Sequence, residues 1–288
     1  MNKSSTQNIN EEVPDKVNYS YKVVKSIECK NGELYLVFCD ISKSGKENYY
    51  LLKKLEIESD EEKRRLVKEI SKIQNMNCKY IIQIYDFFFE KNEQKEMLCI
   101  LMDYYEKGNL KQLVKLKEDF NSRNLWRIFI QIILGLNAVH SNNIIAKNLN
   151  SQNIFIDDEN NIKICGFCPT IDFNKKTDDY STFLYHSPEV IDGQDINKRS
   201  DIWSVGCILY ELITKKKPFY LIENIQRIKY ERSIIHDNDF EYFLSKLLCY
   251  EKSRITINQL FRDKKFVIKM IEENLIDEKI IKGKHIYI

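Results

Sequence analysis

Residues 199–214 read RSDIWSVGCILYELIT and form a nearly continuous apolar run. After three polar residues, almost every position up to Glu211 is apolar or small. Apolar residues on all sides of a helical period predict a helix that is buried on most of its surface. Such a helix needs other elements packed around it, and a chain of 288 residues is long enough to supply them, since proteins of this size bury roughly 75% of their unfolded surface.

The sequence outside this helix changes character near residue 108. Five segments before it are rich in β-branched and aromatic residues and predict strands: 21–28, 33–41, 48–57, 81–90 and 96–105. One helix is predicted among them at 60–76, with Asp60 as its N-cap. After residue 108, helical spacing dominates, with a pair of short strands near 153–158 and 161–167. This order predicts an α+β protein with a small β-rich lobe followed by a larger helical lobe.

The composition excludes several classes of protein. The 45 basic and 43 acidic residues give a net charge of +2, which argues against a nucleic-acid-binding protein. A hydrophobic content of 43% and an aromatic content of 12% argue against a disordered chain. The first 20 residues do not have the pattern of a secretory signal, and no apolar run is long enough for a membrane span, so we expect an intracellular protein, cytoplasmic or nuclear.

The eight cysteines do not form a metal-binding pattern. Only Cys165 and Cys168 make a C-x-x-C pair, and neither a second pair nor a pair of histidines completes a zinc site. We expect reduced thiols and no structural metal.

Five separated segments resemble, in order and spacing, the eukaryotic protein kinase domain. They are LLKK (51–54), KEI (68–70), NLNSQNIFI (148–156), SPE (187–189) and SDIWSVGCILYEL (200–212). Asn153 precedes residue 166 by 13 positions, and Glu189 precedes Asp201 by 12, as in that family. The wording is most similar to the never-in-mitosis-related (NIMA-related) serine/threonine kinases. The resemblance implies a bilobal α+β fold, with an antiparallel β-rich N-lobe carrying one helix and a mainly helical C-lobe.

The resemblance also implies a division of the chain. A polar arm (1–18) would precede a kinase-like domain (19–270), made of an N-lobe (19–102), a hinge (103–107) and a C-lobe (108–270), and an extension (271–288) would follow it. Within this frame the positions implied to bind nucleotide are Lys53, Glu69, Met102, Asp103, Tyr105 and Asn153. Lys53 and Glu69 would form an ion pair, with Lys54 as the competing lysine.

Several nucleotide-binding features of the family are replaced. The three glycines of the phosphate lid fall on Glu28, Lys30 and Glu33, where side chains keep the backbone away from phosphate and the carboxylates repel it. Tyr35 and Leu51 stand where the family has small residues over the adenine, and they would fill its volume. In a different strand register both residues would pack into the core instead.

The residues that the family uses for chemistry are also replaced. Asn148 stands in place of the aspartate base, Asn150 in place of the lysine that steadies the phosphate, and Gly166 in place of the magnesium-binding aspartate. An amide does not accept a proton near neutral pH, and magnesium requires oxygen ligands that glycine lacks. Asp157 and Asp158 read as turn residues, which leaves Asp172 as the one carboxylate that an active enzyme would have to recruit.

The residues that the family uses to hold the C-lobe together are present. Asp201 would hold the backbone of the catalytic loop, Glu189 would pair with Arg254, and Trp203 and Gly206 belong to the same packing. This contrast predicts a pseudokinase, a protein-binding scaffold or allosteric regulator in signalling that requires no cofactor. The alternatives are a divergent active serine/threonine kinase and a sensor that binds ATP without magnesium. Its partners would be proteins, by analogy an active kinase, and the oligomeric state stays open.

Overall fold

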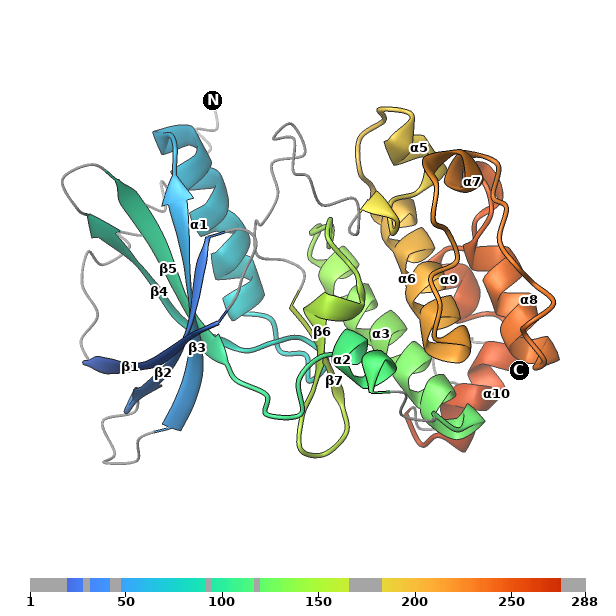
Figure 1. The fold of residues 1–288 in the computed structure, drawn as a ribbon, viewed down its shortest axis with the longest axis horizontal. Coiled ribbons are helices and arrows are strands. Elements are labelled where there is room, and N and C mark those ends of the chain that lie inside the picture. The colour runs from blue at the N-terminus through green and yellow to red at the C-terminus, as the bar shows by residue number, and fades with distance from the viewer. Residues whose placement is uncertain are drawn as a thin grey trace, which may run out of the picture. The chain divides into compact units, whose positions relative to one another are not determined.

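The computed structural model describes residues 20–27, 32–41, 48–91, 95–116, 120–165 and 183–275. The chain divides into two compact units (Figure 1). The first comprises Met1–Gln74 and Gln83–Tyr104, and the second comprises Asn75–Ile82 and Tyr105–Ile288. The first is mainly sheet and the second mainly helix, which confirms the predicted α+β class. No helix of the described ranges is long and apolar enough to cross a membrane.

The first unit is an antiparallel sheet with one helix. Its elements are β1 (Tyr21–Ile27), β2 (Glu33–Cys39), β3 (Asn48–Ile57), α1 (Asp60–Gln74), β4 (Ile84–Lys91) and β5 (Glu96–Asp103). The sheet order is β1-β2-β3-β5-β4. Gly32, just before β2, has a φ of +83°, and a Cβ there would lie 2.2 Å from the carbonyl oxygen of Lys54. A glycine is therefore required at this turn.

The N-cap of helix α1 is one residue earlier than the sequence predicts. The Oγ of Ser59 accepts a hydrogen bond from the backbone N–H of Glu62 at 3.2 Å, so Ser59 caps the helix. The prediction of Asp60 as the cap is wrong. Asp60 lies in the acidic first turn, where its charge is favourable to the helix dipole.

The sheet has two differently occupied faces. On one face a buried cluster forms from Val37, Cys39, Leu52, Phe88, Cys99 and Leu101. Leu66, Ile70 and Ile73 are the buried residues of α1. The Lys63 Nζ of α1 lies 3.9 Å from the centre of the Phe89 ring. Cross-strand pairing aligns Phe89 with Leu98 and Leu98 with Leu55, which places α1 on the face opposite the cluster.

The second unit surrounds the apolar helix predicted from residues 199–214. Its elements are α2 (Leu110–Lys115), α3 (Ser122–Ser141), η1 (Ser151–Asn153), β6 (Ile154–Ile156), β7 (Ile162–Ile164), α5 (Pro188–Ile191), α6 (Lys198–Thr214), α7 (Ile222–Gln226), α8 (Asn238–Leu247), η2 (Glu251–Ser253), α9 (Ile257–Leu260) and α10 (Lys264–Glu272). Helix α6 is buried continuously from Ser200 to Leu212, as predicted.

Close packing around α6 requires a small residue. A Cβ on Gly206 would lie 2.8–2.9 Å from side-chain atoms of Leu247 and Leu248, closer than such atoms approach in proteins. Trp203, fully buried on the same helix, stacks on Phe219 with ring centres 5.3 Å apart. Both residues therefore belong to the packing of this unit, as predicted.

A buried ion pair joins α5 to the segment after η2. Arg254 is 1% exposed and its guanidinium contacts both carboxylate oxygens of Glu189, at 2.6 and 3.0 Å. Burial alone would raise the pKa of Glu189, but the hydrogen bonds and the positive charge of Arg254, together with further hydrogen bonds, outweigh it and lower that pKa. The predicted Glu189–Arg254 salt bridge is confirmed.

Removing one partner of this pair should destabilise the protein strongly. We expect Arg254→Met to lower the free energy of unfolding by about 3–5 kcal/mol, because Glu189 would remain buried without its counter-charge. The midpoint of thermal unfolding should fall by roughly 6–20 °C. Lys252→Met, at an exposed position of η2, is the matched control. Equal midpoints for the two variants, measured by calorimetry, would contradict this role.

Candidate functional site

Two of the residues predicted to bind nucleotide, Lys53 and Met102, lie on the α1 face of the sheet. Cross-strand pairing aligns Leu36 with Leu51 and Leu51 with Met102, so these three side chains share one face. Lys53, two residues after Leu51 on β3, points to the same side. Leu36, Leu51 and Met102 are 6%, 4% and 2% exposed. Large apolar side chains thus occupy the part of the sheet where the family keeps small residues.

The structure corrects the prediction for Tyr35. This residue pairs with Leu52 across β2 and β3 and packs against the buried cluster on the other face. Its hydroxyl donates a hydrogen bond to Glu33 at 2.8 Å. Tyr35 therefore does not share a face with Lys53, and the large residue beside Leu51 is Leu36.

The two lysines of β3 point to opposite faces and have different surroundings. Lys54 pairs with Glu90 at 2.5 Å on the face of the buried cluster. Burial alone would lower the pKa of Lys54, but the hydrogen bond to Glu90 and the neighbouring Cys99, Tyr21 and Glu90 groups together outweigh it and raise that pKa. Lys53 is 8% exposed on the α1 face. Lys53 is thus the lysine on the face of Leu51 and Met102, as preferred in the sequence analysis.

The predicted ion pair between Lys53 and Glu69 is not formed. Among the described residues, the ion pairs of this unit join other lysines to glutamates. Glu69 of α1 has interactions of its own. Lys53 lies on a strand and Glu69 on a helix, as predicted, but the described contacts include no ion pair between them.

The residues predicted to form the hinge are partly committed to internal hydrogen bonds. The backbone N–H of Asp103 donates to the carbonyl of Gln83 at 3.2 Å, and its carboxylate accepts from the Tyr85 hydroxyl at 2.7 Å. Tyr105, in the second unit, accepts from the N–H of Gly108 through its carbonyl at 3.1 Å. Its ring packs near Phe155, with ring centres 6.2 Å apart.

In the second unit, the loop at 146–153 corresponds to the catalytic loop of the family. A buried carboxylate of α6 holds its backbone. Asp201, 2% exposed on α6, accepts hydrogen bonds from the backbone N–H groups of Ala146 at 2.9 Å and Lys147 at 3.2 Å. The Nε2 of His140 lies 2.8 Å from the same carboxylate. Lys147 adopts a φ of +57°, a backbone conformation that the two amide contacts help to hold. The predicted role of Asp201 is confirmed.

Three asparagines of this loop form hydrogen bonds within the loop. The Nδ2 of Asn150 donates to the Oδ1 of Asn148 at 2.8 Å. The Nδ2 of Asn153 donates to the backbone carbonyl of Asn148 at 2.9 Å. The Oδ1 of Asn150 accepts from the N–H of Gln152 at 2.9 Å and so caps η1. The amide at position 148 is therefore part of the internal structure of the loop.

Several predicted positions lie outside the described residues. These are Glu28 and Lys30 of the lid, Gly166, and Asp172. Asp157 and Asp158 lie in the turn between β6 and β7, where the Asp157 carboxylate accepts backbone hydrogen bonds from Glu159 and Asn161 at 3.0 and 2.7 Å. Their prediction as turn residues is confirmed.

The sequence analysis missed a buried polar network beside the loop. The Tyr185 hydroxyl donates to the carboxylate of Glu211, and it lies 3.1 Å from the Oγ of Ser151. Burial raises the pKa of Tyr185, and the adjacent carboxylate raises it further. Ser151 follows Asn150 directly, so this network ties the loop to α6. No local pattern marks residues this far apart in sequence as partners.

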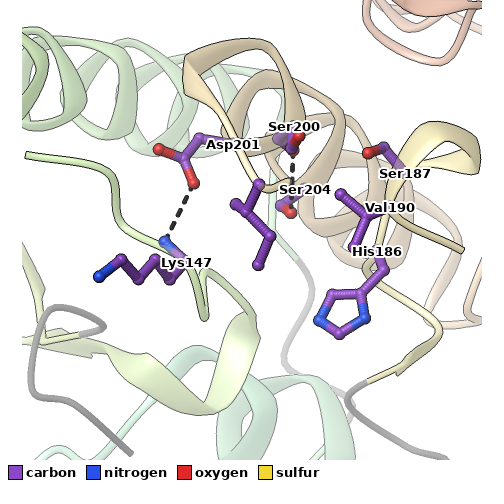
Figure 2. Close-up of a pocket in the computed structure, with 8 residues that line it drawn as sticks. Lys147, His186, Ser187, Val190, Ser200, Asp201 and Ser204 are labelled. Atoms are coloured by element: carbon purple, nitrogen blue, oxygen red, sulfur yellow. Dashed lines mark hydrogen bonds between the residues drawn. The ribbon is translucent and has the colours of Figure 1, made fainter. Parts of the chain in front are cut away.

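A small hollow lies between the catalytic loop and helices α5 and α6 (Figure 2). Its lining includes Lys147, His186, Val190 and Asp201. Its empty volume is about 190 Å³, part of it open to solvent. Sites for drug-sized ligands measure roughly 300–1,000 Å³, so this hollow does not fit a nucleotide. Burial lowers the pKa of His186 to about 4, so its imidazole is neutral here at neutral pH.

Asp201 should control the order of the catalytic loop. We expect Asp201→Asn to speed hydrogen exchange at the amides of Ala146 and Lys147, because an amide offers one acceptor oxygen in place of two. Mass spectrometry of exchanged peptides over residues 144–150 measures this effect. Asp195→Asn, at an exposed position just before α6, is the control. Unchanged exchange in the Asp201 variant would refute the anchoring role.

Comparison with known proteins places this arrangement in a family. The family model described as "Protein kinase domain" matches residues 31–267. The probable serine/threonine-protein kinase nek2 of Dictyostelium discoideum is 30% identical over 219 residues, which are 70% of this chain and 52% of that protein. Mouse serine/threonine-protein kinase Nek1 is 29% identical over 248 residues, which are 81% of this chain and 20% of that protein. The chain thus spans about half or less of these relatives. It belongs to the protein kinase domain family and is similar to the NIMA-related kinases, as its sequence predicts.

Proposed function

We propose that this chain is a pseudokinase, a kinase-fold domain that acts by binding other proteins and does not transfer phosphate at a meaningful rate. The observation that carries the proposal is the state of position 148. Its side chain is an amide, and its Oδ1 is engaged by Asn150 at 2.8 Å. Neither the chemistry nor the surroundings of this group suit a proton acceptor.

The loss of the base has a predictable kinetic consequence. A positioned general base contributes roughly 10²- to 10⁴-fold to a rate, and an amide supplies none of it. The lysine that would stabilise the transferring phosphate is Asn150, which carries no charge and is 2% exposed within the loop. Both losses concern the transition state, so the kinase fold alone does not compensate for them.

The residues present do not fit a magnesium ion. Position 166 is glycine, which offers no side-chain ligand, and Asn153 alone would offer a single amide oxygen. Magnesium binds through carboxylate oxygens in near-octahedral geometry. No cluster of acidic, histidine or cysteine side chains suited to a metal occurs within the described ranges.

Nucleotide binding is the second property that we propose to be weakened. Leu36 and Leu51 are buried side by side on the Lys53 face of the sheet. Two leucines there compete for the space that the family leaves for adenine. Protein partners then become the main ligands, and by analogy with the family an active kinase is the class of partner that we propose.

The names of the relatives favour one alternative, a divergent active kinase. The similar proteins from Dictyostelium discoideum and mouse are both named serine/threonine-protein kinases. Such an enzyme would need a carboxylate from elsewhere, and Asp172 is the residue of this chain in the right part of the sequence. A sensor that binds ATP without magnesium through Lys53 is a further form of the same alternative.

Phosphate transfer by the purified chain tests the proposal. We expect incorporation of labelled phosphate from ATP into a generic substrate to equal that of the Lys53→Met variant. Magnesium-dependent transfer well above that level, abolished by Lys53→Met, would overturn the pseudokinase assignment. The double reversion Asn148→Asp with Gly166→Asp is the complementary variant, since a gain of activity would show that these two positions limit the chemistry.

Thermal unfolding with ATP distinguishes a pseudokinase with a closed nucleotide pocket from one that still binds ATP. A ligand present at 100 times its Kd stabilises the folded state by about 2.7 kcal/mol, a shift of a few degrees in the midpoint. We expect no shift, with or without magnesium, for the natural chain. The double variant Leu36→Val/Leu51→Ala should open space and restore a shift if the leucines exclude adenine. A shift for the natural chain that grows with magnesium would contradict both the closed pocket and the absent metal site.

A further inference from the structure

Helix α1 carries a group of exposed cationic side chains on one side. Arg64, Arg65, Lys68 and Lys72 are all exposed, and we call them the basic face. At 3.6 residues per turn these four positions fall within an arc of about 100° around the helix axis. Leu66, Ile70 and Ile73, the buried residues, occupy the opposite side. The basic face therefore points directly away from the sheet that the helix covers.

The basic face has no acidic partner in the part of the chain that the structure describes. Other lysines of the same unit do: Lys54 pairs with Glu90, Lys63 and Lys91 with Glu96, and Lys95 with Glu56. Glu61 lies on the same arc at the start of α1, yet it pairs with neither arginine among the described contacts. The unit thus matches many of its charges in pairs but leaves this group of four unmatched.

Helix stability accounts for only part of these charges. Cations favour a helix through its dipole only in the last turn, and Lys72 alone lies there. Glu61 stands four residues before Arg65, a spacing that supports a helix, but Arg64, Lys68 and Lys72 are like charges at four-residue intervals and repel one another. A surface that the helix does not need for its own stability is available for recognition.

We propose that the basic face of α1 is a docking surface for an acidic segment of another protein. The spacing of the charges supports this partner. Arg64, Lys68 and Lys72 follow at four-residue intervals, about 6 Å apart along the helix axis and about 12 Å in total. Carboxylates on alternate residues of an extended peptide repeat at nearly the same distance, about 6.7 Å.

Charge complementarity favours an acidic peptide over a nucleic acid. Nucleic-acid binding usually neutralises roughly 6–10 phosphates along an extended surface, whereas this face offers four cations. Asp60, Glu61 and Glu62 close its N-terminal end and would repel a longer polyanion. A short segment with three or four carboxylates matches the face in both length and charge. This inference does not depend on whether the chain transfers phosphate.

Binding of a defined peptide to the full chain tests the proposal. The probe is a fluorescein-labelled peptide of six Glu-Ser repeats, followed by fluorescence anisotropy at 50 and 200 mM NaCl, with six Gln-Ser repeats as the uncharged probe. We expect the glutamate peptide to bind at 50 mM NaCl, more weakly at 200 mM, and the glutamine peptide not to bind. Replacing Arg64, Arg65, Lys68 and Lys72 by Gln should raise the Kd about tenfold or more, since several exposed ion pairs are lost together.

A matched variant separates a defined site from net charge. Lys22, Lys25, Lys229 and Lys252 are also exposed, and their replacement by Gln changes the total charge equally. We expect this variant to keep the Kd of the natural chain within about threefold. Gln is as good a helix former as Arg or Lys, so α1 should persist, and Arg64→Gln/Lys68→Gln serves if the fourfold variant does not fold.

Three outcomes would overturn the proposal. The first is no binding of the glutamate peptide by the natural chain at 50 mM NaCl. The second is an equal rise in Kd in both fourfold variants. The third is tighter binding of a 12-nucleotide single-stranded DNA than of the peptide, lost in the α1 variant, which would assign the face to nucleic acid.

Discussion

The second unit depends on the hydrogen bonds that the buried guanidinium of Arg254 donates. An arginine has five N–H donors, and here all five are used. Two meet Glu189, two meet the carbonyl of Cys249, and one meets the carbonyl of Arg199. The group also lies over the ring of Trp203, 5.1 Å from its centre. A charge buried this deeply is stable only with every donor satisfied, so the three segments that supply the acceptors are held in one arrangement.

That arrangement positions the start of α6, and the start of α6 positions the catalytic loop. Arg199 and Asp201 lie within three residues of each other near the first turn of the helix. One contributes to the Arg254 network and the other accepts the loop amides of Ala146 and Lys147. The backbone of the loop is thus maintained by buried groups that lie outside it. These contacts involve neither position 148 nor position 150.

The sequence predicted those elements whose pattern has a single physical interpretation. Helix α6 is buried on every side, the kinase resemblance implies packing at Gly206 and an ion pair at Arg254, and all three were placed correctly. The strand β2 was different, because ELYLVFC is apolar at nearly every position and its alternation does not distinguish one face from the other. A shift of one residue exchanged Tyr35 for Leu36. Ser59 and Asp60 are both good caps, and only the backbone decides between them. The Tyr185–Glu211 contact joins α6 to a residue 26 positions away and leaves no local mark.

Positions 148 and 150 are best understood together. In the family they carry an aspartate and a lysine, opposite charges on neighbouring turns of the loop. Here both are asparagine, and the two side chains still meet, at 2.8 Å. Asn150 also accepts the N–H of Gln152, which a lysine could not do because its ammonium has no acceptor. Asn150 is 2% exposed, so an uncharged side chain at this position avoids the penalty of burying a charge. The loop is therefore consistent as a neutral structure, held in part by a hydrogen bond from Gln152 that a lysine at position 150 would not accept.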